Sequence, residues 1–175
     1  PGLDWVFIGL SSGEVIAYDL DRERLAPLRL QNFWRERNPR ARSLSVVCMQ
    51  LHPKDIGQLL IGYTEGAVIY SFKQNKPLQY FQYEIPPGAP GGNLDPTADG
   101  RARYPRLTQT LWHPSGTFIA TAHDDSSLVF WDIKEARILM ARTLLDTNVD
   151  KPGGSFAKPG TLSLNEKYTR IAWCA

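Results

Sequence analysis

The sequence predicts an all-β protein made of β-propeller blades, each with four antiparallel strands. The first observation is a spacing of 61 residues that recurs in three pairs: His52 and His113, Tyr70 and Trp131, and Trp112 and Trp173. The second is that residues 107–133 hold three strand-like runs separated by turn residues, which leaves no room for a helix. Units of this kind bury both faces of their sheets when they stack radially, as propeller blades do.

Blade one, residues 3–33, is expected to be incomplete, because its own first strand is missing. The runs WVFIGL and VIAYDL predict two strands joined by a turn at Ser11-Ser12-Gly13, and LAPLRL predicts a more exposed strand. Blade two, residues 44–83, is expected to be complete, with strands SVVCMQL, QLLIGY, VIYSF and PLQYFQY. These runs alternate with turn residues, as hairpin-connected strands do.

Blade three, residues 106–145, repeats this order with LTQTLW, TFIATA, SLVFWDI and ARILMARTL. The start of the next blade is expected at 167–175, in YTRIAWC. In every unit the third strand is apolar nearly without alternation, which predicts that neighbouring layers cover both of its faces. The sequence therefore predicts about three blades of a larger propeller.

Three insertion loops follow the fourth strands, at 32–43, 84–106 and 146–165. A blade of about 40 residues is ordinary, so the 61-residue spacing leaves about 20 extra residues in each unit. Nine of the 23 residues from 84 to 106 are Gly or Pro, which resists helix and sheet alike. In a propeller these links emerge on the same face as the turns between strands two and three. We therefore expect the insertions to share one surface, where repeat proteins place their binding sites.

Charge and composition narrow the class of protein. The net charge is +2, from 20 basic and 18 acidic residues, and acidic residues scattered through every blade argue against a nucleic-acid track. No apolar run approaches the roughly 18 residues that span a bilayer, so we expect a soluble protein that is not transmembrane. Cys48 and Cys174 fit a reducing cytosolic setting, with a disulfide between them as the alternative.

The run HPSGTFIATAHDDSSLVFWDI resembles a WD repeat, with Trp131-Asp132 in the place of the Trp-Asp pair; the second blade has Tyr70-Ser71 there. Together with IGYTEGAVIYSF and PPGAPGG, this run is similar to the lethal giant larvae and tomosyn family, including its fungal exocytosis members. The likeness extends from about Leu3 to Cys174.

The resemblance implies a non-enzymatic scaffold of two tandem seven-bladed propellers, of which this chain would be a fragment. It implies cytoplasmic regulators of vesicle docking and fusion that bind SNARE proteins, both SNAP-25-like and syntaxin-like, and in fungi a Rab-type GTPase. It also implies peripheral association with the plasma membrane and no cofactor. The alternative is a generic WD-repeat scaffold in another cytosolic complex.

The best local candidate for partner binding is an arginine cluster in the first insertion. Arg29, Arg35, Arg37, Arg40 and Arg42 lie within 14 residues, beside Phe33 and Trp34, and only Glu36 offsets their charge. Planar guanidinium groups suit carboxylates and phosphates, so this loop is a candidate for an acidic SNARE segment or an acidic lipid headgroup. The alternative is a solvated loop held in place by Trp34.

The second insertion places Arg101, Arg103 and Arg106 around Tyr104. It is either a flexible tether or a docking loop that becomes ordered on binding.

The residues that look most like an enzyme are interpreted as structural. His123, Asp124 and Asp125 are expected to cap a turn, and Trp131 and Asp132 to pack between blades. Residues 9–13 fit G-x-S-x-G, and a hydrolase using Ser11 is the alternative, but a strand follows the serine where a nucleophile elbow needs a helix. His52 and His113 occupy equivalent turns of successive blades, which argues against a shared metal ion. We therefore expect no catalytic residue and no metal site.

Overall fold

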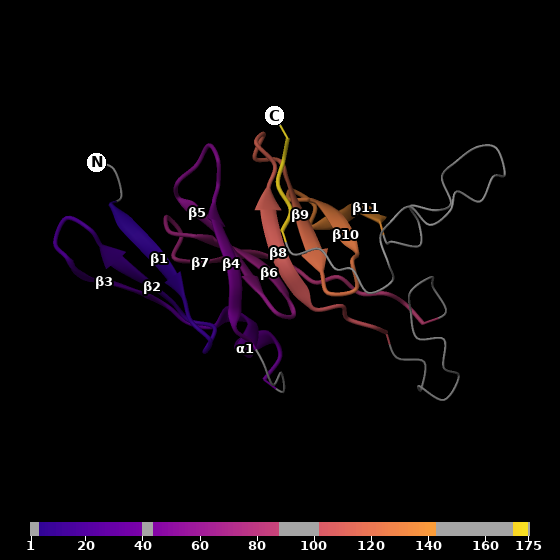
Figure 1. The fold of residues 1–175 in the computed structure, drawn as a ribbon, viewed down its shortest axis with the longest axis horizontal. Coiled ribbons are helices and arrows are strands. Elements are labelled where there is room, and N and C mark those ends of the chain that lie inside the picture. Colours follow the sequence, from indigo (N-terminus) through magenta and orange to yellow (C-terminus); the bar gives the residue numbers. More distant parts are fainter. Residues whose placement is uncertain (1–3, 40–43, 88–101, 143–169, 175) are drawn as a thin grey trace.

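The computed structural model describes residues 4–39, 44–87, 102–142 and 170–174. In these residues the fold is all-β, with three antiparallel sheets that follow one another along the chain as propeller blades do (Figure 1). The sheets do not close into a ring. The predicted fold class is confirmed.

Eleven strands make up the sheets of the described residues. The first sheet contains β1 (Trp5–Gly9), β2 (Val15–Asp19) and β3 (Arg24–Leu30); the second contains β4 (Val46–Leu51), β5 (Gln58–Tyr63), β6 (Gly66–Ser71) and β7 (Lys76–Phe81); the third contains β8 (Leu107–Trp112), β9 (Phe118–His123), β10 (Leu128–Asp132) and β11 (Arg137–Arg142). Within each sheet, every strand pairs with the next strand along the chain. This order is the meander that tight turns between consecutive strands produce.

The middle sheet is buried on both faces because two separate apolar cores lie against it. Side chains of β5 and β6 alternate between these cores: Leu59 and Ile61 face the first sheet, whereas Leu60 and Ile69 face the third. Alternation follows from the two-residue period of a strand, and apolar residues at every position satisfy both cores. Every residue of β6 is buried, as the sequence predicted for a third strand.

β2 and β10 differ from that expectation, because half-buried positions alternate with buried ones along both strands. The second strands β5 and β9 are instead buried at every position after their first residue. In the middle and third sheets, the second strand is therefore covered on both faces, which the sequence did not lead us to expect.

The first insertion begins with a helix where the sequence analysis expected only loop. Helix α1 spans Phe33–Arg37, and Asn32 caps it by accepting the backbone N–H groups of Trp34 and Arg35 at 3.1 Å each. The Asn32 amide group also donates to the carbonyl of Ser12 at 2.9 Å. The helix forms because Asn32 satisfies its first N–H groups and because Phe33 and Trp34 are buried in the core between the first two sheets.

Residues 170–174 are placed beside the third sheet without forming a strand. The Gln109 side chain accepts the N–H of Ile171 at 2.8 Å and donates to its carbonyl at 3.0 Å. A strand forms when its backbone pairs with the backbone of a neighbouring strand. Among the described residues, the backbone of Ile171 pairs instead with the side-chain amide of Gln109.

Candidate interaction site

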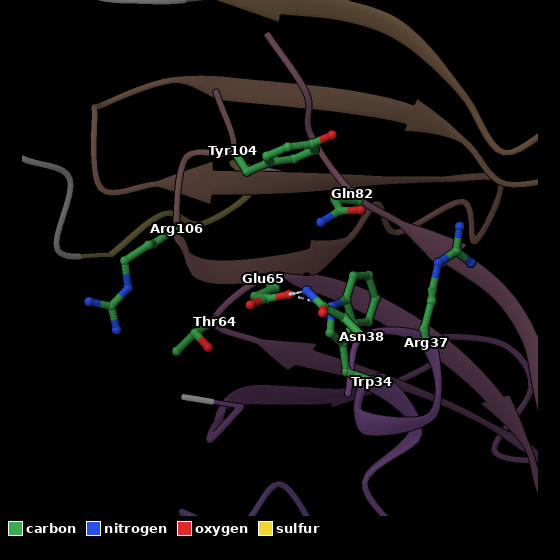
Figure 2. Close-up of a pocket in the computed structure, with 8 residues that line it drawn as sticks. All are labelled: Trp34, Arg37, Asn38, Thr64, Glu65, Gln82, Tyr104 and Arg106. Atoms are coloured by element: carbon green, nitrogen blue, oxygen red, sulfur yellow. Dashed lines mark hydrogen bonds between the residues drawn. The ribbon is translucent and has the colours of Figure 1, made fainter. Parts of the chain in front are cut away.

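A pocket of about 520 Å³ lies where the two predicted binding segments meet (Figure 2). Helix α1 and the residue after it supply Trp34, Arg37 and Asn38, while the turn between β5 and β6 supplies Thr64 and Glu65. The opposite wall comes from the chain between β7 and β8 and is formed by the last three lining residues: Gln82, Tyr104 and Arg106. Insertions of successive blades and a turn between second and third strands therefore share this pocket.

Trp34 forms the buried base of the helix side of the pocket. Its side chain is 1% exposed and packs against Tyr63 and Tyr80. Gly66 gives the indole its room, since a Cβ at Gly66 would lie 2.5 Å from the ring. The aromatic residue that the sequence analysis regarded as an anchor thus fills the core below the pocket.

Glu65 joins the turn between β5 and β6 to helix α1. One carboxylate oxygen, Oε2, accepts the indole N–H of Trp34 at 3.1 Å and the amide of Asn38 at 3.0 Å (Figure 2). Both donors are neutral, so these two bonds orient the carboxylate without cancelling its charge. The base of the pocket therefore carries a fixed negative charge.

Arg37 stands at one rim of the pocket on the last turn of α1. Its guanidinium lies 4.7 Å from the centre of the Tyr80 ring and 6.0 Å from that of Trp34. These cation–π contacts orient the guanidinium group, which remains exposed to solvent. Burial raises the pKa of Tyr80, so its ring remains a neutral platform at physiological pH.

The opposite wall is held at its base by a backbone bridge. Ile85 and Arg103 exchange two N–H to carbonyl hydrogen bonds of 2.9 Å, and these connect the chain leaving β7 to the chain entering β8. Tyr104 follows the bridge and is 50% exposed. Desolvation, with Glu84 nearby, raises the pKa of Tyr104, so its hydroxyl is protonated near neutral pH.

The turn between β9 and β10 fixes this wall through three consecutive residues. A ring nitrogen of His123, Nδ1, lies 3.2 Å from the carbonyl oxygen of Pro105, and Asp124 accepts the backbone N–H of Arg106 at 3.0 Å. Asp125 forms an ion pair of 3.3 Å with Arg103. Each residue of the turn thus holds one residue of the segment that carries Tyr104 and Arg106. The sequence analysis expected His123, Asp124 and Asp125 to cap their own turn; Asp125 also does so, by accepting the N–H and hydroxyl of Ser127.

His123 is connected to Trp131 through a buried hydroxyl. The Trp131 indole donates to the Thr121 hydroxyl oxygen at 2.9 Å, and that hydroxyl lies 3.0 Å from Nε2 of His123. The Pro105 carbonyl can only accept, so the ring proton of the neutral imidazole is assigned to Nδ1, and Nε2 then accepts the proton of the Thr121 hydroxyl. Burial lowers the pKa of His123, which favours this neutral form. Asp132 is outside the network and caps the next turn by accepting the N–H of Glu135 at 2.9 Å.

The structure divides the arginines that the sequence analysis grouped together. Arg29 pairs with Glu14 through contacts of 2.9 and 3.0 Å, so Glu36 is not the only acidic residue near the cluster. Arg35 lines a second hollow of about 370 Å³, with Glu14 and Glu36 at its edge. Arg40, Arg42 and Arg101 lie outside the described residues.

Four pocket residues were missed by the sequence analysis as candidates for binding: Asn38, Thr64, Glu65 and Gln82. Thr64 and Glu65 lie in what looked like an ordinary hairpin turn. The available signal was topological, because turns between second and third strands emerge on the same face as the insertions.

The described residues do not form the arrangement that a hydrolase using Ser11 or a metal site would require. Ser11 lies in the turn between β1 and β2, and strand β2 follows it, so the strand–serine–helix arrangement of a nucleophile elbow is not formed. Across the described ranges, no three His, Cys, Asp or Glu side chains gather as a metal site would require. Cys48 and Cys174 are both free thiols, and burial raises the pKa of Cys48. In the described residues α1 is the only helix, and it is far too short to cross a bilayer.

Comparison with known proteins finds relatives that match nearly the whole chain, among them the following two, while no family model matches. The sequence is 41% identical over 174 residues to the Lethal(2) giant larvae protein homolog SRO77 of Saccharomyces cerevisiae. The matched residues make up 99% of this chain and 17% of that protein. It is 28% identical over 186 residues to an uncharacterized protein of Schizosaccharomyces pombe, covering 99% of this chain and 18% of that protein. The chain thus spans less than a fifth of the length of either relative.

Proposed function

Because this chain belongs to the lethal giant larvae family, we propose that it is part of a non-enzymatic scaffold that binds SNARE proteins and regulates vesicle docking and fusion in polarised exocytosis. The partners would be SNAP-25-like and syntaxin-like proteins, together with a Rab-type GTPase. The scaffold would be cytoplasmic, with peripheral association at the plasma membrane through acidic lipids.

The observation that carries the proposal is the shared pocket on one face of the blades. Segments from two insertions and the turn between β5 and β6 converge there, with exposed arginine and tyrosine side chains at the rim. Loops that a rigid sheet framework holds together are where repeat proteins bind partners. The relation to a lethal giant larvae homolog supports protein partners of the exocytic machinery.

The test is a pull-down of purified SNARE proteins by the full-length protein. A SNAP-25-like and a syntaxin-like protein should each be retained, and a SNARE of the vesicle side serves as the control. Retention of none of them would reject SNARE regulation and favour the alternative, a generic WD-repeat scaffold in another cytosolic complex.

The arginine cluster of the first insertion has a test of its own. Reversing Arg35, Arg37, Arg40 and Arg42 to Glu in the full-length protein should weaken binding to SNARE proteins or to vesicles that contain acidic lipids. Unchanged binding to both would remove the cluster from the proposal.

A further inference from the structure

We propose that the pocket between helix α1 and the Tyr104 segment binds an acidic peptide segment of a partner protein, with acidic side chains at the Arg37 and Arg106 rims and an apolar side chain against Tyr104. The inference deepens the proposed scaffold function and rests on it. Its support is the arrangement of charge and aromatic surface around the hollow.

The arginines near the pocket differ in their availability to a ligand. Arg29 and Arg103 are engaged in internal ion pairs with Glu14 and Asp125. Within the described residues, no ion pair joins Arg37 or Arg106 to a carboxylate, and both side chains are exposed. These two arginines stand on opposite sides of the pocket (Figure 2). Guanidinium groups in this state favour a ligand with carboxylates.

The base of the pocket carries the carboxylate of Glu65. The Glu65 carboxylate receives two neutral donors, Trp34 and Asn38, and forms no ion pair among the described side chains. A compact anion placed deep in the pocket would be repelled by it. The favoured ligand is therefore extended, with its acidic groups separated so that they reach the rims and avoid the base.

The shape and the lining of the pocket suit a peptide better than a membrane surface. The pocket is concave, so a flat bilayer would contact its rims and leave its interior unfilled. Gln82 contributes a half-buried amide to the wall, and an amide both donates to and accepts from a peptide backbone. Tyr104 offers an exposed ring of the kind that forms the apolar centre of many protein interfaces. These features favour a peptide.

Both walls of the pocket are held in place by internal contacts. The Ile85–Arg103 bridge and the contacts from His123, Asp124 and Asp125 hold the segment that carries Tyr104 and Arg106. On the other wall, Asn32 caps the helix that carries Arg37. A site whose walls are fixed in advance loses less conformational entropy when a ligand binds.

The experiment selects short random peptides displayed on phage with the full-length protein as bait. Peptides captured by the wild-type protein should be enriched in Asp and Glu around an aromatic or aliphatic residue. The double reversal Arg37→Glu and Arg106→Glu should remove that enrichment and weaken a selected peptide by about tenfold or more in fluorescence anisotropy. The matched control is the double reversal Arg24→Glu and Arg137→Glu, which makes the same change of charge at exposed positions on β3 and β11.

The outcomes separate this inference from the proposed function. Wild-type enrichment that survives in the control and is lost in the pocket variant supports the inference. No acidic enrichment, or equal enrichment by the pocket variant, overturns it even if the SNARE pull-down succeeds. Flotation with vesicles of phosphatidylcholine and phosphatidylserine tests the membrane as the ligand instead. If the pocket variant loses vesicle binding but still binds the selected peptides, the assignment of a peptide ligand is overturned. A failed pull-down with intact peptide selection would reject the SNARE partners and leave the pocket assignment in place.

Discussion

The imidazole of His52 lies edge-on against the indole of Trp112, with the ring centroids 4.4 Å apart and the planes at 71°. The same contact recurs one unit further along, where His113 meets Trp173 at 4.6 Å and 88°. In both turns Nδ1 of the histidine accepts a backbone N–H two residues ahead. Each histidine ring is therefore held by its own turn and packs against a tryptophan of the following unit.

Trp112→Ala should loosen the junction between the second and third sheets. The side chain is 2% exposed, and its indole N–H donates to the carbonyl of Gln50 at 3.2 Å. Removal of a buried tryptophan costs about 3–5 kcal/mol. Hydrogen–deuterium exchange of β4 and β8 in the full-length protein should rise strongly, and less so in Trp112→Phe, which keeps most of the apolar contact. Unchanged exchange in the alanine variant would contradict the assigned role.

Asn32→Ala should release helix α1. The amide group caps the helix and also bonds the Ser12 carbonyl, so its loss should cost about 1–2 kcal/mol. Exchange of the Trp34 and Arg35 amides is the measurement. Asn32→Asp keeps the capping acceptor and should protect those two amides better than alanine does. Equal exchange in the two variants would show that capping is not what holds the helix.

Gly66→Ala should disturb the base of the pocket. The added methyl would lie 2.4 Å from the Phe81 carbonyl and 2.5 Å from the Trp34 ring, and overpacking of this kind costs about 1–3 kcal/mol. The midpoint of thermal unfolding should fall. Gly57→Ala is the control, because its methyl meets only the exposed Asp55 side chain. A similar midpoint for both variants would count against the packing described for Trp34.

Asp124→Ala should weaken peptide capture without touching the pocket. Asp124 accepts the N–H of Arg106, and its own N–H donates to the Arg106 carbonyl at 2.9 Å. Loss of the side-chain bond should weaken binding severalfold, since one exposed charge-assisted hydrogen bond contributes about 1 kcal/mol. Asp124→Asn keeps the acceptor and should bind like the wild type. Both variants lose the same negative charge, so a difference between them reports the position of Arg106.

The stability of the third sheet should fall with acid because of His123. Burial lowers its pKa in the folded protein, whereas the unfolded chain takes up the proton at about pH 6.5. Below about pH 6.5 the unfolded state binds more protons than the folded state, so the free energy of unfolding decreases as the pH falls. Above about pH 6.5 His123 is neutral in both states and causes no such loss. The slope is at most about 1.4 kcal/mol per pH unit for this one group.

Urea midpoints at about pH 7.5 and about pH 5.5 would measure this effect. His123→Gln retains a donor toward Pro105 and an acceptor toward Thr121, and its midpoint should change less with pH. An equal pH dependence in the two proteins would assign the effect to other groups.

The strands were predictable because their signals are local. Alternating and continuous apolar runs bounded by turn residues define β4 to β7 without reference to distant residues. Helix α1 was missed because its cap is completed from outside, by the bond between Asn32 and Ser12. A helix of one turn has almost no periodicity of its own to detect.

The candidate site was only partly predictable for a similar reason. The sequence indicates Arg37 and Tyr104, since arginine and aromatic residues cluster in the insertions. It does not indicate that Arg29 and Arg103 are engaged by Glu14 and Asp125, which lie 15 and 22 residues away in the chain. Those pairings depend on strand register and on the stacking of the blades.

The bridge between Ile85 and Arg103 makes the second insertion a favourable place for protein engineering. Because two backbone hydrogen bonds fix the entry and exit of the insertion, the length of chain between them is decoupled from the positions of β7 and β8. Loop-closure entropy also grows only slowly with length. A fluorescent domain with adjacent termini, inserted between these two anchors, would sit beside Tyr104 and provide a sensor of pocket occupancy while leaving the blades intact.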